Sequence, residues 1–182
     1  MKRLIIRKIC YLLSITIIIM FAACKEKKEE TPAVKPFEIS KYLGLWYEIA
    51  RLDFKYERGL NNTTAQYNLN ENGTVKVLNK GFAYEKNEWK TAEGKAKFVK
   101  DTNEGRLKVS FFGPFYSAYT VVAIDKEYKY ALVAGESLSY LWILSRSTTI
   151  PDTIKNQFLQ TAKNLGYNTN DLIWVEHYKF EN

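Results

Sequence analysis

The stretch YLGLWYEIARLDFKYERGL, residues 42–60, decides the fold of this 182-residue chain. Apolar and polar residues alternate from Trp46 to Lys55, which predicts a β-strand with one buried face. The strand is preceded by Gly44 and followed by a charged turn that ends at Gly59. The pattern of the other strands shows what kind of sheet this first strand belongs to.

Short alternating runs separated by turn residues continue through most of the chain. They predict seven further strands, over 63–69, 74–84, 89–99, 106–112, 117–125, 130–134 and 140–147. The connections at 70–73 and 101–105 are rich in Asn, Asp and Gly, which tolerate the backbone angles of tight turns. Eight strands at nearly regular spacing indicate an all-β, antiparallel up-and-down sandwich or barrel.

One segment departs from the strand pattern. In residues 151–165, Ile154, Phe158 and Ala162 recur every four residues, and Gly166 follows the end. This spacing predicts an amphipathic α-helix that lies on the sheet. A last strand is expected over 172–178.

Several sequence blocks, in this order and with the helix after them, resemble the lipocalin family, and most closely the bacterial lipocalins related to apolipoprotein D. The blocks are 44–47 (GLWY), 54–60 (FKYERGL), 108–116 (KVSFFGPFY), Asp125 with Tyr128, and 141–146 (LWILSR). The resemblance implies one lipocalin domain over 37–182. Its expected fold is an eight-stranded antiparallel up-and-down barrel with one C-terminal α-helix and a short final strand.

The resemblance gives three residues a structural role at the closed end of the barrel. Gly44 would let the backbone turn beneath the barrel floor, and Trp46 would plug it. The guanidinium of Arg146 would lie on the Trp46 ring in a cation–π contact worth about 0.5–2 kcal/mol.

Alternate residues of a strand share one face, so the orientation of Arg146 predicts which other residues face the barrel interior and could contact a ligand. If Arg146 points inward, so do Leu144 and Trp142, while Tyr116 shares a face with Thr120 and Ile124. The expected ligand-binding residues are Tyr67, Phe98, Phe111, Tyr116, Trp142 and Leu144, of which the resemblance favours Tyr116 and Trp142.

An eight-stranded barrel can be filled by side chains or can hold one small ligand. Lipocalins typically keep the cavity, so the resemblance implies binding, storage or transport of a small amphipathic lipid such as a fatty acid or a lysophospholipid. The alternative is an interaction lipoprotein with a filled barrel, whose aromatic surface at Phe112, Phe115 and Tyr119 binds a protein partner or a second copy in a homodimer. A haem-like or isoprenoid ring is a third possible ligand. Glu57 and Arg58 could contact a polar ligand group or fix their loop.

The N-terminus has the pattern of a bacterial lipoprotein signal. Four basic residues precede an apolar run, and residues 1–23 end with two alanines directly before Cys24. Cleavage would leave Cys24 as a lipid-modified N-terminus, followed by a flexible tether over 24–36. An uncleaved anchor helix is the alternative. Lys25 after the cysteine favours the outer membrane, facing either the periplasm or the cell surface.

Charge and composition exclude several function classes. Removal of the four basic residues of 1–23 from the 27 in the chain leaves 23 basic against 20 acidic residues, a formal charge of about +3. No basic stripe interleaved with aromatics indicates nucleic-acid binding. His177 is the only histidine, and neither cysteine remains as a free thiol after processing. The sequence therefore predicts no catalytic site, cofactor or metal site.

Overall fold

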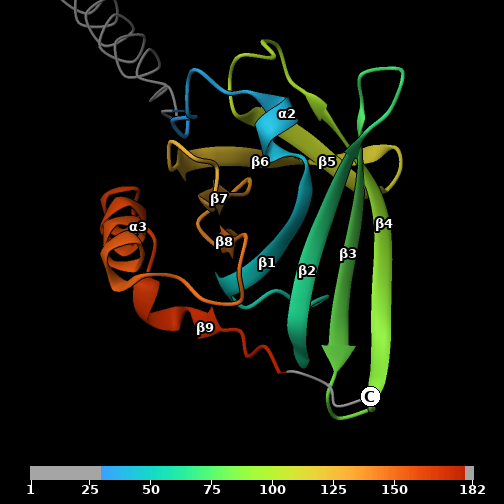
Figure 1. Cartoon of the computed structure of the whole chain (residues 1–182), viewed down its shortest axis with the longest axis vertical. Helices are drawn as coiled ribbons and strands as arrows, with labels where there is room; N and C mark the ends of the chain where they lie inside the picture. Colours follow the sequence, from blue (N-terminus) through green and yellow to red (C-terminus); the bar gives the residue numbers. More distant parts are fainter. Residues whose placement is uncertain (1–29, 179–182) are drawn as a thin grey trace, which may run out of the picture. The chain divides into compact units, whose positions relative to one another are not determined.

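The computed structural model describes residues 30–178, and its strands form one antiparallel sheet that closes on itself (Figure 1). The sheet order is β2-β3-β4-β5-β6-β7-β8-β1-β9, and β1 also pairs with β2. The strands are β1 (Gly44–Arg51), β2 (Leu60–Leu69), β3 (Val75–Ala83), β4 (Glu88–Phe98), β5 (Arg106–Phe112), β6 (Phe115–Ile124), β7 (Tyr130–Ala134), β8 (Leu141–Ser145) and β9 (Ile173–Trp174). The expected eight-stranded barrel with an extra strand is confirmed.

Barrel closure depends on β1, which pairs with β2 along one edge and with β8 along the other. This strand ends at Arg51, four residues before the predicted end, because the chain leaves the sheet at Leu52. The last strand, β9, pairs only with the end of β1 and is two residues long, much shorter than the expected 172–178.

Two separate apolar clusters explain the alternation of residues in the strands. One cluster lies inside the barrel and includes Val75 and Val77 of β3. The other lies between the outer face of β1, β7 and β8 and the helix α3 (Asp152–Asn164). Phe158 and Ala162 of α3 are buried there, as the four-residue spacing predicts. In Figure 1, α3 and the long strands β3 and β4 lie on opposite sides of the barrel.

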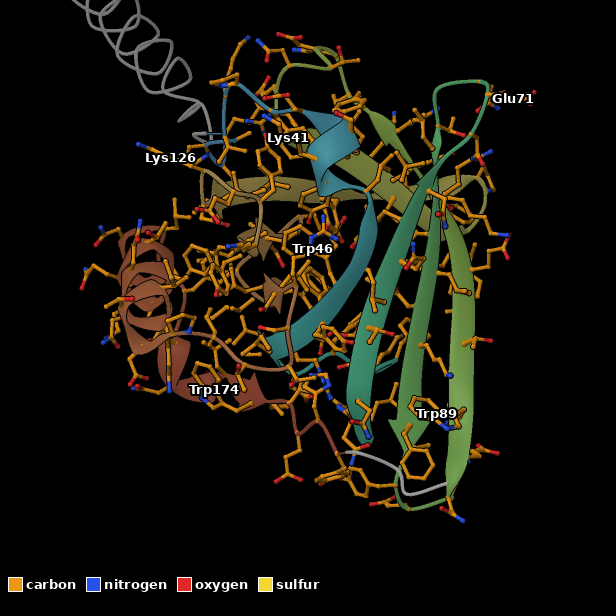
Figure 2. The ribbon with its side chains drawn as sticks, viewed as in Figure 1. Lys41, Trp46, Glu71, Trp89, Lys126 and Trp174 are labelled. Carbon is orange, nitrogen blue, oxygen red and sulfur yellow. The ribbon has the colours of Figure 1, made fainter. Side chains whose placement is uncertain are left out.

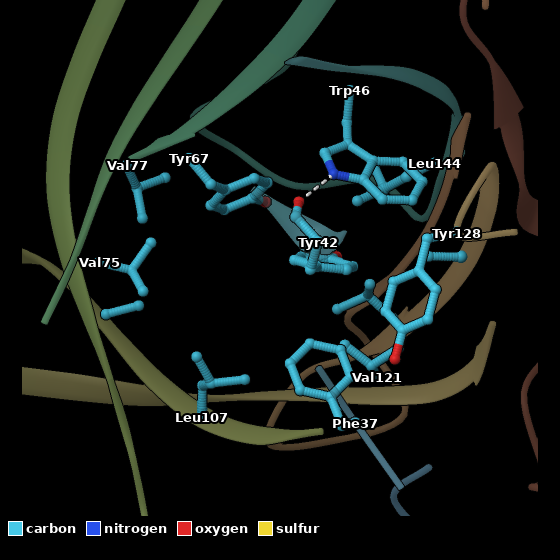
Figure 3. Close-up of a cluster of buried hydrophobic side chains, with 13 residues drawn as sticks. Phe37, Tyr42, Trp46, Tyr67, Val75, Val77, Leu107, Val121, Tyr128 and Leu144 are labelled. Atoms are coloured by element: carbon cyan, nitrogen blue, oxygen red, sulfur yellow. Dashed lines mark hydrogen bonds between the residues drawn. The ribbon is translucent and has the colours of Figure 1, made fainter. Parts of the chain in front are cut away.

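The closed end of the barrel is covered by the chain that precedes β1. The short helix α2 (Ile39–Tyr42) places Tyr42 in the interior cluster, together with Phe37 (Figure 3). Residues 31–36 are held to the barrel: Val34 donates its N–H to the Val121 carbonyl at 2.9 Å and accepts from the Gly105 N–H at 2.9 Å. The flexible tether expected over 24–36 therefore does not include 31–36. Cys24 and the predicted signal lie outside the described residues.

Candidate ligand-binding barrel

Trp46 forms the floor of the barrel and is completely buried. Its indole Nε1 donates to the Tyr42 carbonyl at 2.7 Å, and the Tyr42 ring lies 4.9 Å from its own. The Arg146 guanidinium lies 3.8 Å from the centroid of the Trp46 ring, so the expected stacking is present. Figure 3 shows Trp46, Tyr42 and Tyr67 converging at this end.

Arg146 also ties together the turn that leads into β1. Its guanidinium donates to the carbonyls of Lys41 (2.9 Å), Tyr42 (3.1 Å), Leu43 (2.8 Å) and Leu45 (2.7 Å). Gly44 has φ +95°, a conformation that residues with a side chain rarely adopt, and an added Cβ would lie 3.4 Å from Arg146 Nη1. The glycine therefore provides both the turn and the close approach of the arginine.

Three tyrosine hydroxyls meet above the floor. Tyr119 hydrogen-bonds to Tyr42 at 2.6 Å and to Tyr67 at 2.9 Å. Burial raises the pKa of all three hydroxyls well above the ordinary range of a tyrosine. Tyr119, which was expected in an exposed aromatic surface, instead points into the barrel, so that expectation was wrong.

The opposite, mouth half of the barrel is organised by the loop 52–59. This loop turns back on itself, since the Glu57 N–H donates to the Phe54 carbonyl at 2.9 Å. The turn sends two adjacent charged residues in different directions. Arg58 pairs with the exposed Asp53, with Nη2 2.6 Å from Oδ2, whereas Glu57 accepts a 3.1 Å hydrogen bond from Trp142 Nε1.

A buried ion pair lies on β1 beside Glu57. Arg51 Nη1 donates to Glu48 Oε1 at 2.6 Å, and Nη2 donates to the Glu57 and Leu60 carbonyls. Burial and, second to it, the negative charge of Glu48 raise the pKa of Glu57 to about 8, against the opposing effects of Trp142 and Arg51. At neutral pH Glu57 is therefore mainly a neutral carboxylic acid, while Arg51 and Glu48 balance each other's charge.

The predicted ligand contacts fall in three places. Tyr67, Phe98 and Leu144 belong to the packed floor half, where Phe98 lies 6.3 Å from the Phe37 ring. Phe111 and Trp142 project inward nearer the mouth. Phe111 lies directly over Gly94, because a Cβ at that position would come within 2.8 Å of its ring.

Tyr116 lies on the outer face of the barrel, so its expected inward orientation was wrong. Its ring packs beneath the Lys97 and Lys108 ammonium groups, at 4.8 and 5.5 Å from the centroid. Tyr119, three residues later, pairs with inward-facing Leu107. Parity counted from Ile124 fails because the β6–β7 register shifts between Val121 and Ala123, and such a bulge moves every residue beyond it to the other face.

Burial differs between the two halves of the interior. Side chains at the floor, such as Trp46, Val75 and Val121, are at most 1% exposed. In contrast, the inward-facing Phe111 and Trp142 nearer the mouth are only partly buried. Packing around these two side chains is therefore less complete than around Trp46.

The lone histidine and the acidic residues form no reactive cluster in the part of the chain that the structure describes. His177 lies outside the barrel, with its ring 5.5 Å from that of Tyr47. Across residues 30–178, no three His, Cys, Asp or Glu side chains come together in a way that could hold a metal ion. Over the same range, no helix has the length and apolar character needed to cross a bilayer.

Residues 37–177, which include the barrel, α3 and β9, match the family described as "Lipocalin-like domain". The chain belongs to the lipocalin family. This lipocalin is 47% identical to the outer membrane lipoprotein Blc of Vibrio cholerae over 159 residues, which cover 87% of this chain and 93% of the relative. It is 48% identical to Blc of Escherichia coli K12 over 143 residues, with coverage of 79% and 81%.

More distant similarities support the same assignment. Rat apolipoprotein D is 37% identical over 128 residues, which cover 66% of each chain. Among solved structures, insecticyanin from the tobacco hornworm Manduca sexta superposes with a TM-score of 0.68 at 21% identity, covering 82% of this lipocalin and 86% of that chain. The likeness to that structure concerns the fold alone. The chain is a bacterial outer membrane lipoprotein of the lipocalin family and a binding protein rather than an enzyme.

Sequence reasoning missed the ion pair of Glu48 and Arg51. One signal was available, because Glu48 is two residues from Trp46 and therefore shares its inward face. The inward orientation of Arg51 could not be predicted by counting alternate residues, because the β1–β8 register shifts between Glu48 and Ala50. Glu57 was considered as either a loop residue or a ligand contact, and the structure directs it inward.

Proposed function

We propose that the barrel binds one single-chain amphipathic lipid, a fatty acid or a lysophospholipid, with its acyl chain inside and its polar head at the mouth. The observation that carries the proposal is the contrast inside the barrel. Packed side chains close the floor, whereas Phe111 and Trp142 keep accessible apolar surface beneath a polar rim at Glu57.

The acyl chain supplies most of the binding free energy. Each methylene transferred from water contributes about 0.8 kcal/mol, so ten buried carbons contribute about 8 kcal/mol. Part of this offsets the lost freedom of the lipid. The remainder is compatible with a carrier that binds its ligand reversibly.

The protonation of Glu57 makes the mouth compatible with an anionic head. With its pKa raised to about 8, Glu57 carries little charge at pH 7 and repels a carboxylate or phosphate weakly. Arg51 Nε is buried and has no hydrogen-bond partner among residues 30–178. This donor is available to a polar head group, although the charge of Arg51 is balanced by that of Glu48.

The lipid anchor gives this binding a biological setting. Attachment through Cys24 would hold the barrel close to the bilayer, where single-chain lipids arise when phospholipids are damaged. A tethered carrier could collect these lipids, store them or return them for repair.

Native mass spectrometry of the mature protein after incubation with a cell lipid extract tests the proposal. We expect a discrete adduct with one lipid per chain or per dimer, which is lost in Trp142→Ala. Trp174→Ala is the matched control, because Trp174 on β9 lies away from the barrel interior marked by Trp46 (Figure 2). Bare protein at every lipid concentration, or equal adducts in both variants, would refute binding in the barrel.

A second function is favoured by the exposed aromatic tip between β5 and β6. Phe112 and Phe115 are 67% and 79% exposed, and exposed rings of this size are unusual unless they meet a partner. A second copy of the chain would bury them in a homodimer. Light scattering of the Phe112→Ser/Phe115→Ser variant checks this, since a dimer held by the tip should dissociate.

A further inference from the structure

The outer face of β3, β4 and β5 carries a strong excess of positive charge. The outward positions of these strands hold one acidic residue, Glu93, which pairs with Lys76 at 2.9 Å. The basic residues on the same face are Lys76, Lys80, Lys95, Lys97, Arg106 and Lys108. This face lies on the side of the barrel opposite α3 (Figure 1).

Three of these lysines, Lys95, Lys97 and Lys108, form what we call the lysine cluster. Lys97 and Lys108 occupy directly opposite positions of β4 and β5, and Lys95 is directly opposite Lys76. Like charges at directly opposite positions destabilise a sheet. Within residues 30–178, none of the acidic side chains forms an ion pair with the lysine cluster.

Tyr116 supports this arrangement from the neighbouring strand. Its ring lies under both the Lys97 and the Lys108 ammonium groups, within 6 Å of each. Cation–π contacts of this kind hold two ammonium groups near one point without neutralising them. The fold thus gathers cationic charge on a surface that includes an aromatic ring.

The chain leaves the barrel beside the lysine cluster. Arg106 Nη2 donates to the Thr31 carbonyl at 2.8 Å, and Arg106 is two residues from Lys108 on the same outer face of β5. Thr31 is seven residues along the chain from Cys24, and this stretch spans at most about 25 Å when fully extended. A lipid on Cys24 would therefore keep Thr31, which lies beside the lysine cluster, within that distance of the bilayer surface.

We infer that the lysine cluster docks on the phosphate-bearing anionic lipids of the leaflet that holds the anchor. Each lysine near an anionic membrane surface strengthens association by about fivefold. Docking through this face would set the orientation of the barrel relative to the bilayer, which a flexible anchor alone does not do. The inference is independent of the ligand in the barrel and needs only the anchor at Cys24.

Amine labelling of the lipidated protein in vesicles tests the inference. The protein is reconstituted into phosphatidylcholine vesicles with or without a third of phosphatidylglycerol, and flotation verifies that it is attached to both. A small acylating reagent followed by mass spectrometry should show severalfold lower labelling of Lys95, Lys97 and Lys108 on the anionic vesicles. High salt should restore labelling, because it screens exposed charges.

Two variants with the same loss of charge complete the test. Lys97→Gln/Lys108→Gln should remove the protection of Lys95, whereas Lys86→Gln/Lys163→Gln, in the β3–β4 turn and on α3, should leave it unchanged. Equal labelling of Lys95, Lys97 and Lys108 on both vesicle types would overturn the inference. Protection of the lysine cluster by a soluble polyanion but not by anionic vesicles would also overturn it.

Discussion

The floor and the mouth half of the barrel differ in how their polar groups are satisfied. At the floor, Arg146 donates to four carbonyls, and Tyr42, Tyr67 and Tyr119 bond to one another. Nearer the mouth, the inward-facing Asn79 has a buried side-chain oxygen with no hydrogen-bond partner in the described part of the chain. Arg51 Nε is likewise buried and has no hydrogen-bond partner among the described residues.

This difference separates stability from function. Buried polar groups without partners cost free energy, whereas fully bonded ones specify a single packing. The floor therefore stabilises the barrel, and the mouth half retains bonding capacity that a ligand or ordered water can use. Substitutions at the floor should change unfolding, while those at the mouth should change binding and pH dependence.

The largest expected effect is the loss of Trp46. Trp46→Ala removes a completely buried ring from the floor and should lower the free energy of unfolding by about 3–5 kcal/mol. Denaturant unfolding followed by circular dichroism measures the change. Trp89→Ala is the matched control: Trp89 is 44% exposed on the outer face of β4, and we expect a loss below about 1 kcal/mol. Similar losses in both variants would contradict a floor that dominates stability.

A smaller effect should follow from Arg146→Lys. Lysine keeps the charge, but it cannot donate to several carbonyls while it lies flat on the Trp46 ring. We expect a loss of about 2 kcal/mol in the free energy of unfolding, measured in the same way. An unchanged lipid adduct in the folded variant would show that the floor can be weakened without altering the mouth.

The floor was predictable because its residues have fixed places relative to one another in a recognisable motif. The sequence of Gly44, Trp46 and Arg146 indicated both the turn and the stacking, and no register change separates Trp46 from the turn. The helix was predictable for a similar reason, because Phe158 and Ala162 repeat at the helical period.

The mouth half was less predictable because its geometry depends on register shifts. A shift between Val121 and Ala123 turned Tyr116 outward and Tyr119 inward, and one between Glu48 and Ala50 directed Arg51 into the interior. Strand parity cannot detect an extra residue from a single sequence. The burial of Glu57 depends on the fold of the whole loop 52–59. The two adjacent charged residues, Glu57 and Arg58, do not indicate which of them points inward.

The pH dependence of stability distinguishes the two halves further. Folded Glu57 keeps its proton up to about pH 8, whereas an unfolded glutamate releases it near pH 4.3. Between these values the folded state binds more protons than the unfolded state, so the contribution of Glu57 to stability falls as the pH rises. Glu57→Gln should flatten this decline in urea unfolding measured from pH 5 to 8. A tryptophan fluorescence change with a midpoint near pH 8, caused by ionisation beside Trp142, should also disappear.

An identical pH profile in the wild type and Glu57→Gln would show that Glu57 is ionised in the folded chain. The mouth would then present a fixed negative charge, and a cationic or zwitterionic head would be preferred to a fatty acid. The measurement therefore also sharpens the choice between the two proposed lipids.

The smallest effect concerns Tyr116, and it tests which face of β6 meets the ligand. Phe111→Ala removes an inward-facing ring and should weaken lipid binding by about tenfold. Tyr116→Ala removes a ring that contacts only the outer face near Lys97 and Lys108, so lipid affinity should stay within about twofold. Fluorescence titration with a single-chain lipid compares the two variants. A larger loss in Tyr116→Ala than in Phe111→Ala would place the ligand outside the barrel, on the same face as the lysine cluster, because no bound chain inside the barrel could contact Tyr116 directly.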